Sequence, residues 1–218
     1  MPALATDPIT AALARAQLAQ RTATATPQAP YTRSFGDYIA SVFPSFPFTR
    51  HTNRLVAIAQ RVADGELPRL MVELPPRHYK STIFSRFLPG YFLRRHPDRT
   101  WGQGANTQTL AAEFGEAARD YFLASGGSLH PSSTGKDRWK TAGGLGGFWA
   151  AGVGKGTGLP ADFLNVDDPI KGREQADSPT IRAKTWDAYV EDLQTRLPSD
   201  YCPFTGSLFA MNSRRLRT

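Results

Sequence analysis

Cysteine is nearly absent from this sequence of 218 residues, in which Cys202 stands alone. A disulfide needs two cysteines, and structural zinc sites usually take two or more. An internal disulfide framework and a cysteine-based zinc site are therefore both excluded. The cytosol is the compartment that we expect for such a chain.

Long apolar runs are absent as well. No run approaches the roughly 20 residues that a membrane-spanning helix needs. The N-terminal segment, MPALATDPITAALARAQLAQR, lacks the basic start and apolar core of a secretory signal. The four histidines are dispersed, with no carboxylate or cysteine at ligand spacing, so a histidine metal site is not expected. We expect a soluble protein with no membrane partner.

Acidic residues are too few to balance the basic ones. The chain has 26 Lys and Arg against 19 Asp and Glu, which gives a net charge of +7. Such a balance favours polyanionic partners, nucleic acid first. Arginines scattered over a solvated surface, including Arg214, Arg215 and Arg217, would explain the excess equally well.

What is present fits one globular core, since 40% of the residues are apolar and 21% are charged. Expected helices cover residues 8–21, 37–43, 52–63, 80–95 with a kink at Pro89, a segment capped by Thr107, and a segment that Pro179 opens. Expected strands cover 70–74, 100–105 and 161–168, with short strands and hairpin turns over the glycine-rich stretch 126–158. Strands that alternate with helices predict an α/β fold with a mainly parallel sheet and helices on both faces.

The last of these helices carries an apolar stripe at helical spacing. Its members lie at i, i+3, i+4, i+7 and i+11: Trp186, Tyr189, Val190, Leu193 and Leu197. The spacing predicts that this stripe faces the core.

The stretch from Leu70 to Thr82 combines an apolar strand, a tight loop (PPRHY) and a helix start (KST). A strand, a loop ending in Lys-Ser/Thr and a helix form the arrangement that binds nucleotide phosphates. Lys80 would reach the outer phosphates, and the hydroxyl of Ser81 would ligate magnesium. The consensus, however, places glycine where this chain has Leu74 and Tyr79. A Pro-Pro turn before a basic helix start is therefore the alternative interpretation.

A second segment, Phe163 to Asp168, is an apolar strand that ends in two carboxylates and contains one polar residue, Asn165. Nucleotide-hydrolysing folds need one such carboxylate for hydrated magnesium and a neighbour to orient the attacking water. Because ligands of α/β sheets lie at the carboxyl ends of the strands, we expect Asp167 and Asp168 beside the loop of residues 75–80. An Asp-Asp pair before proline is otherwise a common turn or helix-capping device.

A second glycine-rich stretch, Gly152–Gly158 (GVGKGTG), could also be read as a phosphate loop around Lys155. No long helical pattern follows it. A hairpin or a turn that leads into the Asp-Asp strand is the interpretation that we favour.

The motifs PPRHYKS and VDDPIKGREQADSPTIRAKTWDAYVEDLQTRL together resemble the ATPase half of the large terminase subunit of tailed phages and prophages. Members of that family carry Pro-Pro-Arg-His before the phosphate loop, the Asp-Asp-Pro strand end, the Ala-Asp-Ser-Pro helix start and a Thr-Arg-Leu helix end. The resemblance covers roughly residues 35–198. It implies a P-loop NTPase domain over 35–198, preceded by a helix and linker (1–34) and followed by a divergent or truncated tail (199–218). The sheet would then be incomplete at the C-terminus.

The resemblance also implies roles for individual residues. Lys80 would contact the β- and γ-phosphates of ATP, and Arg77 would sense or stabilise the γ-phosphate. Asp167 and Ser81 would hold Mg²⁺, and Asp168 would take the place of the catalytic carboxylate. His78, Tyr79 and Thr82 complete the expected nucleotide-binding loop.

The function implied is ATP-driven translocation of double-stranded DNA into a viral procapsid, in the host cytoplasm. The implied partners are duplex DNA, a small terminase subunit, the portal protein and further copies of the chain. No nuclease activity is expected, because the clustered acids of the family's nuclease domain do not follow.

Two departures from the family leave an alternative open. Tyr79 replaces the usual glycine, at a cost of about 1–2 kcal/mol if its φ is positive. The apolar strand ending in Thr-Arg-Trp is replaced by a segment in which only Ser207–Met211 shows a slight likeness. The alternative is a catalytically inactive prophage remnant that keeps the fold and at most binds nucleotide or DNA. An unrelated helicase or kinase is a third alternative, although their later motifs are absent.

Overall fold

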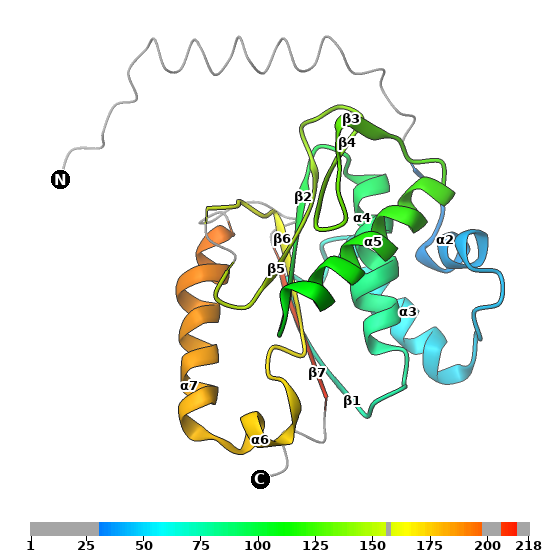
Figure 1. Cartoon of the computed structure of the whole chain (residues 1–218). Helices are drawn as coiled ribbons and strands as arrows, with labels where there is room; N and C mark the ends of the chain where they lie inside the picture. Colours follow the sequence, from blue (N-terminus) through cyan, green and yellow to red (C-terminus); the bar gives the residue numbers. More distant parts are fainter. Residues whose placement is uncertain (1–30, 156–157, 198–205, 213–218) are drawn as a thin grey trace, which may run out of the picture.

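The computed structural model describes residues 31–155, 158–197 and 206–212, and its centre is a seven-stranded sheet (Figure 1). The strands are β1 (Arg69–Leu74), β2 (Thr100–Ala105), β3 (Leu129–Thr134), β4 (Arg138–Thr141), β5 (Gly147–Gly152), β6 (Phe163–Asp167) and β7 (Gly206–Asn212). Their order across the sheet is β1-β7-β6-β2-β5-β4-β3. All neighbours from β1 to β5 pair in parallel, while β4 and β3 are antiparallel additions. The expected α/β fold with a mainly parallel sheet is confirmed.

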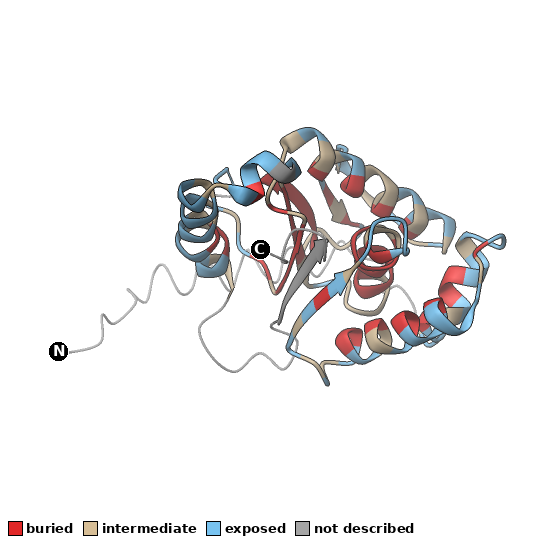
Figure 2. Cartoon of the chain, turned by 90° about the horizontal axis from the view of Figure 1, so that it is seen from below, coloured by how far each residue is buried: buried red, intermediate tan, exposed pale blue. Residues whose placement is uncertain are grey.

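Helices cover both faces of this sheet. They are α2 (Phe35–Val42), α3 (Arg50–Ala63), α4 (Leu88–Arg95), α5 (Gln108–Ala124), α6 (Gly172–Asp177) and α7 (Pro179–Ala188). Figure 1 shows α3, α4 and α5 on one side and α7 on the other. Alternate residues of β5 serve the two sides: Phe148 belongs to the larger apolar cluster, whereas Trp149 packs in a smaller one with Leu193. Figure 2 shows buried residues concentrated on the central strands and the inward sides of the helices.

Side-chain caps define where the helices begin. Ser34, Thr49, Thr107 and Ser178 each accept a hydrogen bond from a backbone N–H of the first helical turn. These bonds satisfy donors that have no partner within the helix. The cap predicted at Thr107 and the helix start predicted at Pro179 are both confirmed.

The helix expected over residues 80–95 changes its winding part of the way along. It is helical from Lys80, widens into the π-helical segment η1 (Thr82–Phe87) and continues as α4. Pro89 has no N–H for the usual bond to a carbonyl four residues earlier, and the wide turn before it accommodates that loss. The π-helical segment ends two residues before Pro89, the position where the sequence predicted a kink.

The apolar stripe predicted for the last helix is only half correct. Tyr189 and Leu193, both in the π-helical segment η2 (Tyr189–Leu193), are buried, but Trp186 is 60% exposed and Val190 is 36% exposed. No residue of α7 is buried. The helix therefore contacts the sheet mainly through its C-terminal continuation, η2 and the 3-10 turn η3 (Gln194–Arg196).

The segment that the sequence set apart as a tail contributes a central strand. β7 pairs with β1 on one side and with β6 on the other. The sheet is therefore continuous from the loop-bearing strand to the carboxylate-bearing strand. The helix expected over residues 8–21 lies outside the described residues. Among those described, no helix has the length and apolar character needed to cross a bilayer.

Candidate functional site

The loop between β1 and η1 adopts an unusual backbone conformation. Arg77 and Tyr79 have φ angles of 66° and 62°, in the left-handed region that most side chains avoid. Each costs about 1–2 kcal/mol relative to glycine. Turns with such alternation aim backbone N–H groups at a common point and form anion-binding concavities. Tyr79 thus has a backbone conformation that favours glycine.

Two side-chain contacts connect this strained loop to the rest of the protein. The ring of Tyr79 meets the ring of Phe46 edge to face, with centroids 5.5 Å apart. Nε2 of His51, on α3, lies 3.3 Å from the carbonyl oxygen of His78, and the two imidazole rings are 5.6 Å apart. These contacts help to offset the local backbone strain.

Lys80 is the point at which the loop meets the carboxylates of β6. Its ammonium is buried, and Nζ lies 2.8 Å from Oδ1 of Asp168 and 3.1 Å from Oδ1 of Asp167. The sequence-based expectation that both carboxylates lie beside the loop is confirmed. One strand, β7, separates β1 from β6, so the two segments meet at the carboxyl edge of the sheet.

Asp167 is held by a buried polar network that sequence reasoning missed. Its Oδ2 accepts a hydrogen bond of 2.7 Å from the hydroxyl of Ser85, in η1. That hydroxyl in turn accepts a bond of 3.0 Å from the amide of Asn165, which also donates to Oε1 of Gln103 at 2.9 Å. The polar residue inside an apolar strand was the one visible signal of this network. The network fixes the orientation of the Asp167 carboxylate.

Asp168 is also constrained. Its φ of 43° is in the left-handed region, and its carbonyl accepts a hydrogen bond of 2.9 Å from the side chain of Asn106. Asn106 follows directly after β2, the neighbour of β6 in the sheet. The side chain of Asp168 keeps 25% of its surface exposed, so it can contact solvent while it pairs with Lys80.

A cavity of about 240 Å³ opens at this point. It is lined by the ten residues Leu74, Pro75, Pro76, Arg77, His78, Tyr79, Lys80, Ser81, Thr82 and Asp168. All the residues predicted as nucleotide-binding are therefore together at its wall. Asp167 is not among the lining residues, and its buried carboxylate contacts Lys80. The concentration of Arg77 and Lys80 with a helix start suits an anionic phosphate group.

The oxygen atoms present would suit a hard divalent cation. Oδ1 of Asp167 is buried and has no aligned hydrogen bond, although it is within ion-pair distance of Lys80. In the described residues, no group of three or more His, Cys, Asp or Glu side chains could hold a metal ion. A site that binds Mg²⁺ through one or two protein oxygens, with the rest from substrate and water, fits this donor set.

The other glycine-rich stretch does not form a comparable site. β5 ends at Gly152, and Gly154 and Gly158 have φ angles of 82° and 83°. In the described part of the chain, no helix intervenes between this stretch and β6. A turn that leads into the Asp-Asp strand, as expected, is the arrangement observed.

Comparison of the chain with protein-family models and with curated protein sequences gave no match.

Proposed function

We propose that this chain is the ATPase region of a DNA-packaging terminase large subunit, with a P-loop NTPase fold. It couples ATP hydrolysis to the movement of double-stranded DNA into a viral procapsid. The observation that carries the proposal is the position of Lys80, buried between Asp167 and Asp168 at the base of a loop with positive φ angles. A strand, a loop, a helix-start lysine and two carboxylates from another strand meet there, as phosphoryl transfer requires.

Lys80 and Arg77 act on the phosphates of ATP. When the nucleotide enters, its β- and γ-phosphates take over the interactions of Nζ that the two carboxylates hold in the free protein. The exposed guanidinium of Arg77 lines the same cavity and spreads positive charge over the γ-phosphoryl oxygens. Both cations stabilise charge that develops as the terminal phosphoryl group transfers.

Asp167 and Ser81 would hold Mg²⁺ in this proposal. The bound metal would supply positive charge that offsets the negative charge of the phosphates. Ser85 keeps the Asp167 carboxylate in one orientation through its 2.7 Å hydrogen bond.

Asp168 orients the attacking water. Its partly exposed carboxylate lines the cavity together with the loop residues and can accept a hydrogen bond from the attacking water. Asn106 fixes its main chain through the bond to the carbonyl. His78, Tyr79 and Thr82 shape the loop around the phosphates.

The partners proposed with this function are duplex DNA, a small terminase subunit, the portal protein and further copies of the chain. The proposed location is the cytoplasm of the host. The net charge of +7 supports a polyanionic partner.

A specific observation supports a second candidate function, in which the chain is an inactive prophage remnant that retains the fold. Tyr79 lines the cavity and holds a backbone conformation that favours glycine. A side chain at that position can crowd a phosphate, and turnover then fails even though the fold persists.

The deciding experiment measures ATP hydrolysis with and without duplex DNA. We expect DNA-stimulated, Mg²⁺-dependent turnover that falls about a hundredfold in Lys80→Ala. Lys80→Arg keeps a positive charge beside the carboxylates, so this variant should stay folded and can show whether turnover is lost without unfolding. Lys136→Ala, which removes an exposed lysine paired with Glu116, is the matched control and should leave turnover unchanged.

Two results decide against the proposal. Turnover that survives both Lys80 variants would overturn the assignment of the site. Absence of turnover in the wild type together with its appearance in Tyr79→Gly would establish the remnant.

A further inference from the structure

The antiparallel hairpin β3–β4 carries a pronounced irregularity. Leu129 pairs with Thr141 and Thr134 pairs with Trp139, so four residues of β3 (130–133) stand opposite the single residue Lys140. A strand with extra residues must bulge away from its partner. Pro131, within the bulge, has no N–H to donate, which is tolerated because β3 is the edge strand.

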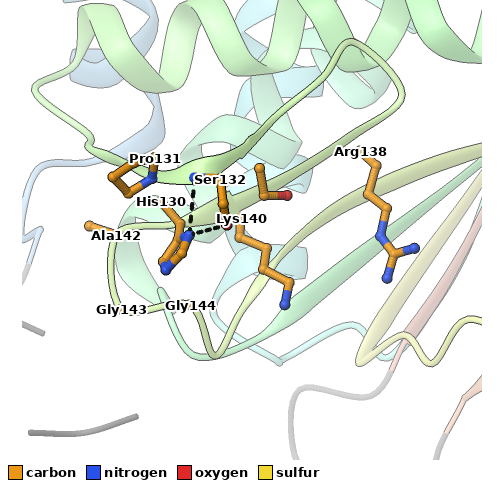
Figure 3. A pocket seen from close by; sticks show the side chains of 9 residues that line it. His130, Pro131, Ser132, Arg138, Lys140, Ala142, Gly143 and Gly144 are labelled. Atoms are coloured by element: carbon orange, nitrogen blue, oxygen red, sulfur yellow. Dashed lines mark hydrogen bonds between the residues drawn. The ribbon is translucent and has the colours of Figure 1, made fainter. Parts of the chain in front are cut away.

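The bulge forms one wall of a cavity of about 540 Å³ (Figure 3). Strand β4 and the turn around Gly144 form the remaining walls. This volume falls within the range of roughly 300–1,000 Å³ that small-molecule sites occupy. The hairpin lies at the opposite edge of the sheet from β1, so this cavity is separate from the one beside Lys80.

The charge of this cavity is positive. Arg138 and Lys140 are two positions apart on β4 and both line it, whereas Trp139 between them is buried on the other face. No lining residue is acidic. Within the described ranges, neither Arg138 nor Lys140 forms an ion pair, in contrast to Lys136 in the same hairpin, which pairs with Glu116. The cavity therefore contains two cationic groups whose charge no carboxylate neutralises.

His130 adds a directed hydrogen-bond donor. Its Nδ1 accepts a bond of 3.3 Å from the backbone N–H of Ser132 and lies 2.9 Å from the Ser132 hydroxyl (Figure 3). Because Nδ1 is an acceptor there, the ring proton is on Nε2. No described residue provides a hydrogen-bond partner for Nε2. The bulge thus orients an imidazole N–H on the side of the hairpin that carries Arg138 and Lys140.

We propose that the β3–β4 hairpin binds a phosphate group. Lys140 and Arg138 supply charge-assisted hydrogen bonds, and His130 donates from Nε2. The phosphate belongs either to a small phosphorylated molecule or to a nucleic-acid backbone. This site is independent of the ATPase proposal, since it shares no residue with the Lys80 cavity.

The test is a titration of the full chain with inorganic phosphate at constant ionic strength, followed by NMR. We expect saturable shifts of the Gly143 and Gly144 amides and of the His130 ring protons. Arg138→Ala and Lys140→Ala should each weaken this binding about tenfold. Lys136→Ala, with the same change of charge on the same hairpin, should leave it unchanged. Thermal unfolding verifies that each variant is folded. If Lys140→Ala does not fold, Arg138→Gln replaces it in the titration, because Arg138 is exposed and its substitution should not disturb the fold.

A second arm replaces phosphate with an eight-residue oligothymidylate. Tighter binding of the oligonucleotide, lost in the same variants, identifies a nucleic-acid backbone; equal or weaker binding identifies a small phosphorylated ligand. The proposal is overturned if the hairpin signals do not shift saturably, or if Lys136→Ala weakens binding as much as Lys140→Ala. Signals of residues 77–81 report any phosphate at the Lys80 cavity separately, so the two proposals fail independently.

Discussion

Nζ of Lys80 lies 2.8 Å from Oδ1 of Asp168, although 88 positions separate the two residues in the chain. The side chain of Lys80 is 8% exposed, and that of Asp167, 3.1 Å away, is 1% exposed. Burial of Lys80 and Asp167 is tolerable only because each has an opposite charge within ion-pair distance. The same contact that prepares a candidate phosphate site therefore also contributes to the stability of the fold.

Removal of the lysine should destabilise the protein markedly. Lys80→Ala leaves the buried carboxylate of Asp167 and the partly exposed carboxylate of Asp168 without their cation, and we expect the free energy of unfolding to fall by about 3 kcal/mol. Urea denaturation measures the change. The exposed pair Lys136–Glu116 provides the control, where Lys136→Ala should cost less than about 1 kcal/mol. Equal losses in the two variants would contradict a buried, mutually dependent charge cluster.

Substitution of Ser81 and of Ser85 by alanine should affect the stability of the protein to different extents. Ser85→Ala removes the donor to Asp167 and an acceptor of Asn165, and it should cost about 1–3 kcal/mol of stability. The hydroxyl of Ser81 forms no hydrogen bond with another described residue, so Ser81→Ala should change stability by less than about 0.5 kcal/mol. ATP turnover, in contrast, should fall sharply in Ser81→Ala. A stability loss in Ser81→Ala comparable to that of Ser85→Ala would refute this separation.

The backbone at residue 79 can be tested by two small substitutions. Tyr79→Ala and Tyr79→Gly both remove the contact with Phe46, but only glycine accepts a φ of 62° without strain. We expect the glycine variant to be more stable than the alanine variant by about 1 kcal/mol. Thermal or urea unfolding gives the difference. Equal stabilities would mean that the left-handed conformation is absent in solution.

Acid should destabilise the region where α4 ends. Burial lowers the pKa of His96 below its ordinary value of 6.5. The unfolded chain then binds a proton more readily than the folded one, so the contribution of neutral His96 to stability is present above pH 6.5 and is lost as the pH falls below it. His96→Gln should show a shallower loss of unfolding free energy between pH 7 and pH 5 than the wild type. Parallel curves for the two proteins would exclude His96 as a source of acid sensitivity.

Local signals predicted most elements of this fold. Strand β2 coincides with the expected residues 100–105, and the Thr107 cap and the Ser178-Pro179 helix start are where the sequence indicated. Such features depend on interactions between residues close in sequence. The carboxylates at the end of β6 could be placed beside the loop because all parallel strands present their carboxyl ends at one edge.

Long-range arrangement limited what else could be predicted. Spacing alone predicted that Trp186 and Leu193 both face the core, yet Trp186 is 60% exposed and Leu193 is buried. Periodicity identifies an apolar side of a helix but does not say how much of the helix touches the sheet. The role of Ser85 was equally hidden, since its partners Asp167 and Asn165 belong to strand β6, more than 75 positions away. The bulge in β3 depends on pairing register, which the sequence did not reveal.

The position of β7 imposes an order of assembly on the protein. It is synthesised after every other described strand, yet it lies between β1 and β6. Until residues 206–212 have emerged from the ribosome, the strand that leads to Lys80 and the strand that ends in Asp167 have no common neighbour to fix their separation. Non-local parallel pairing of this kind forms late and slowly. The chain therefore completes its sheet and the edge that carries its candidate site in the same late step of folding.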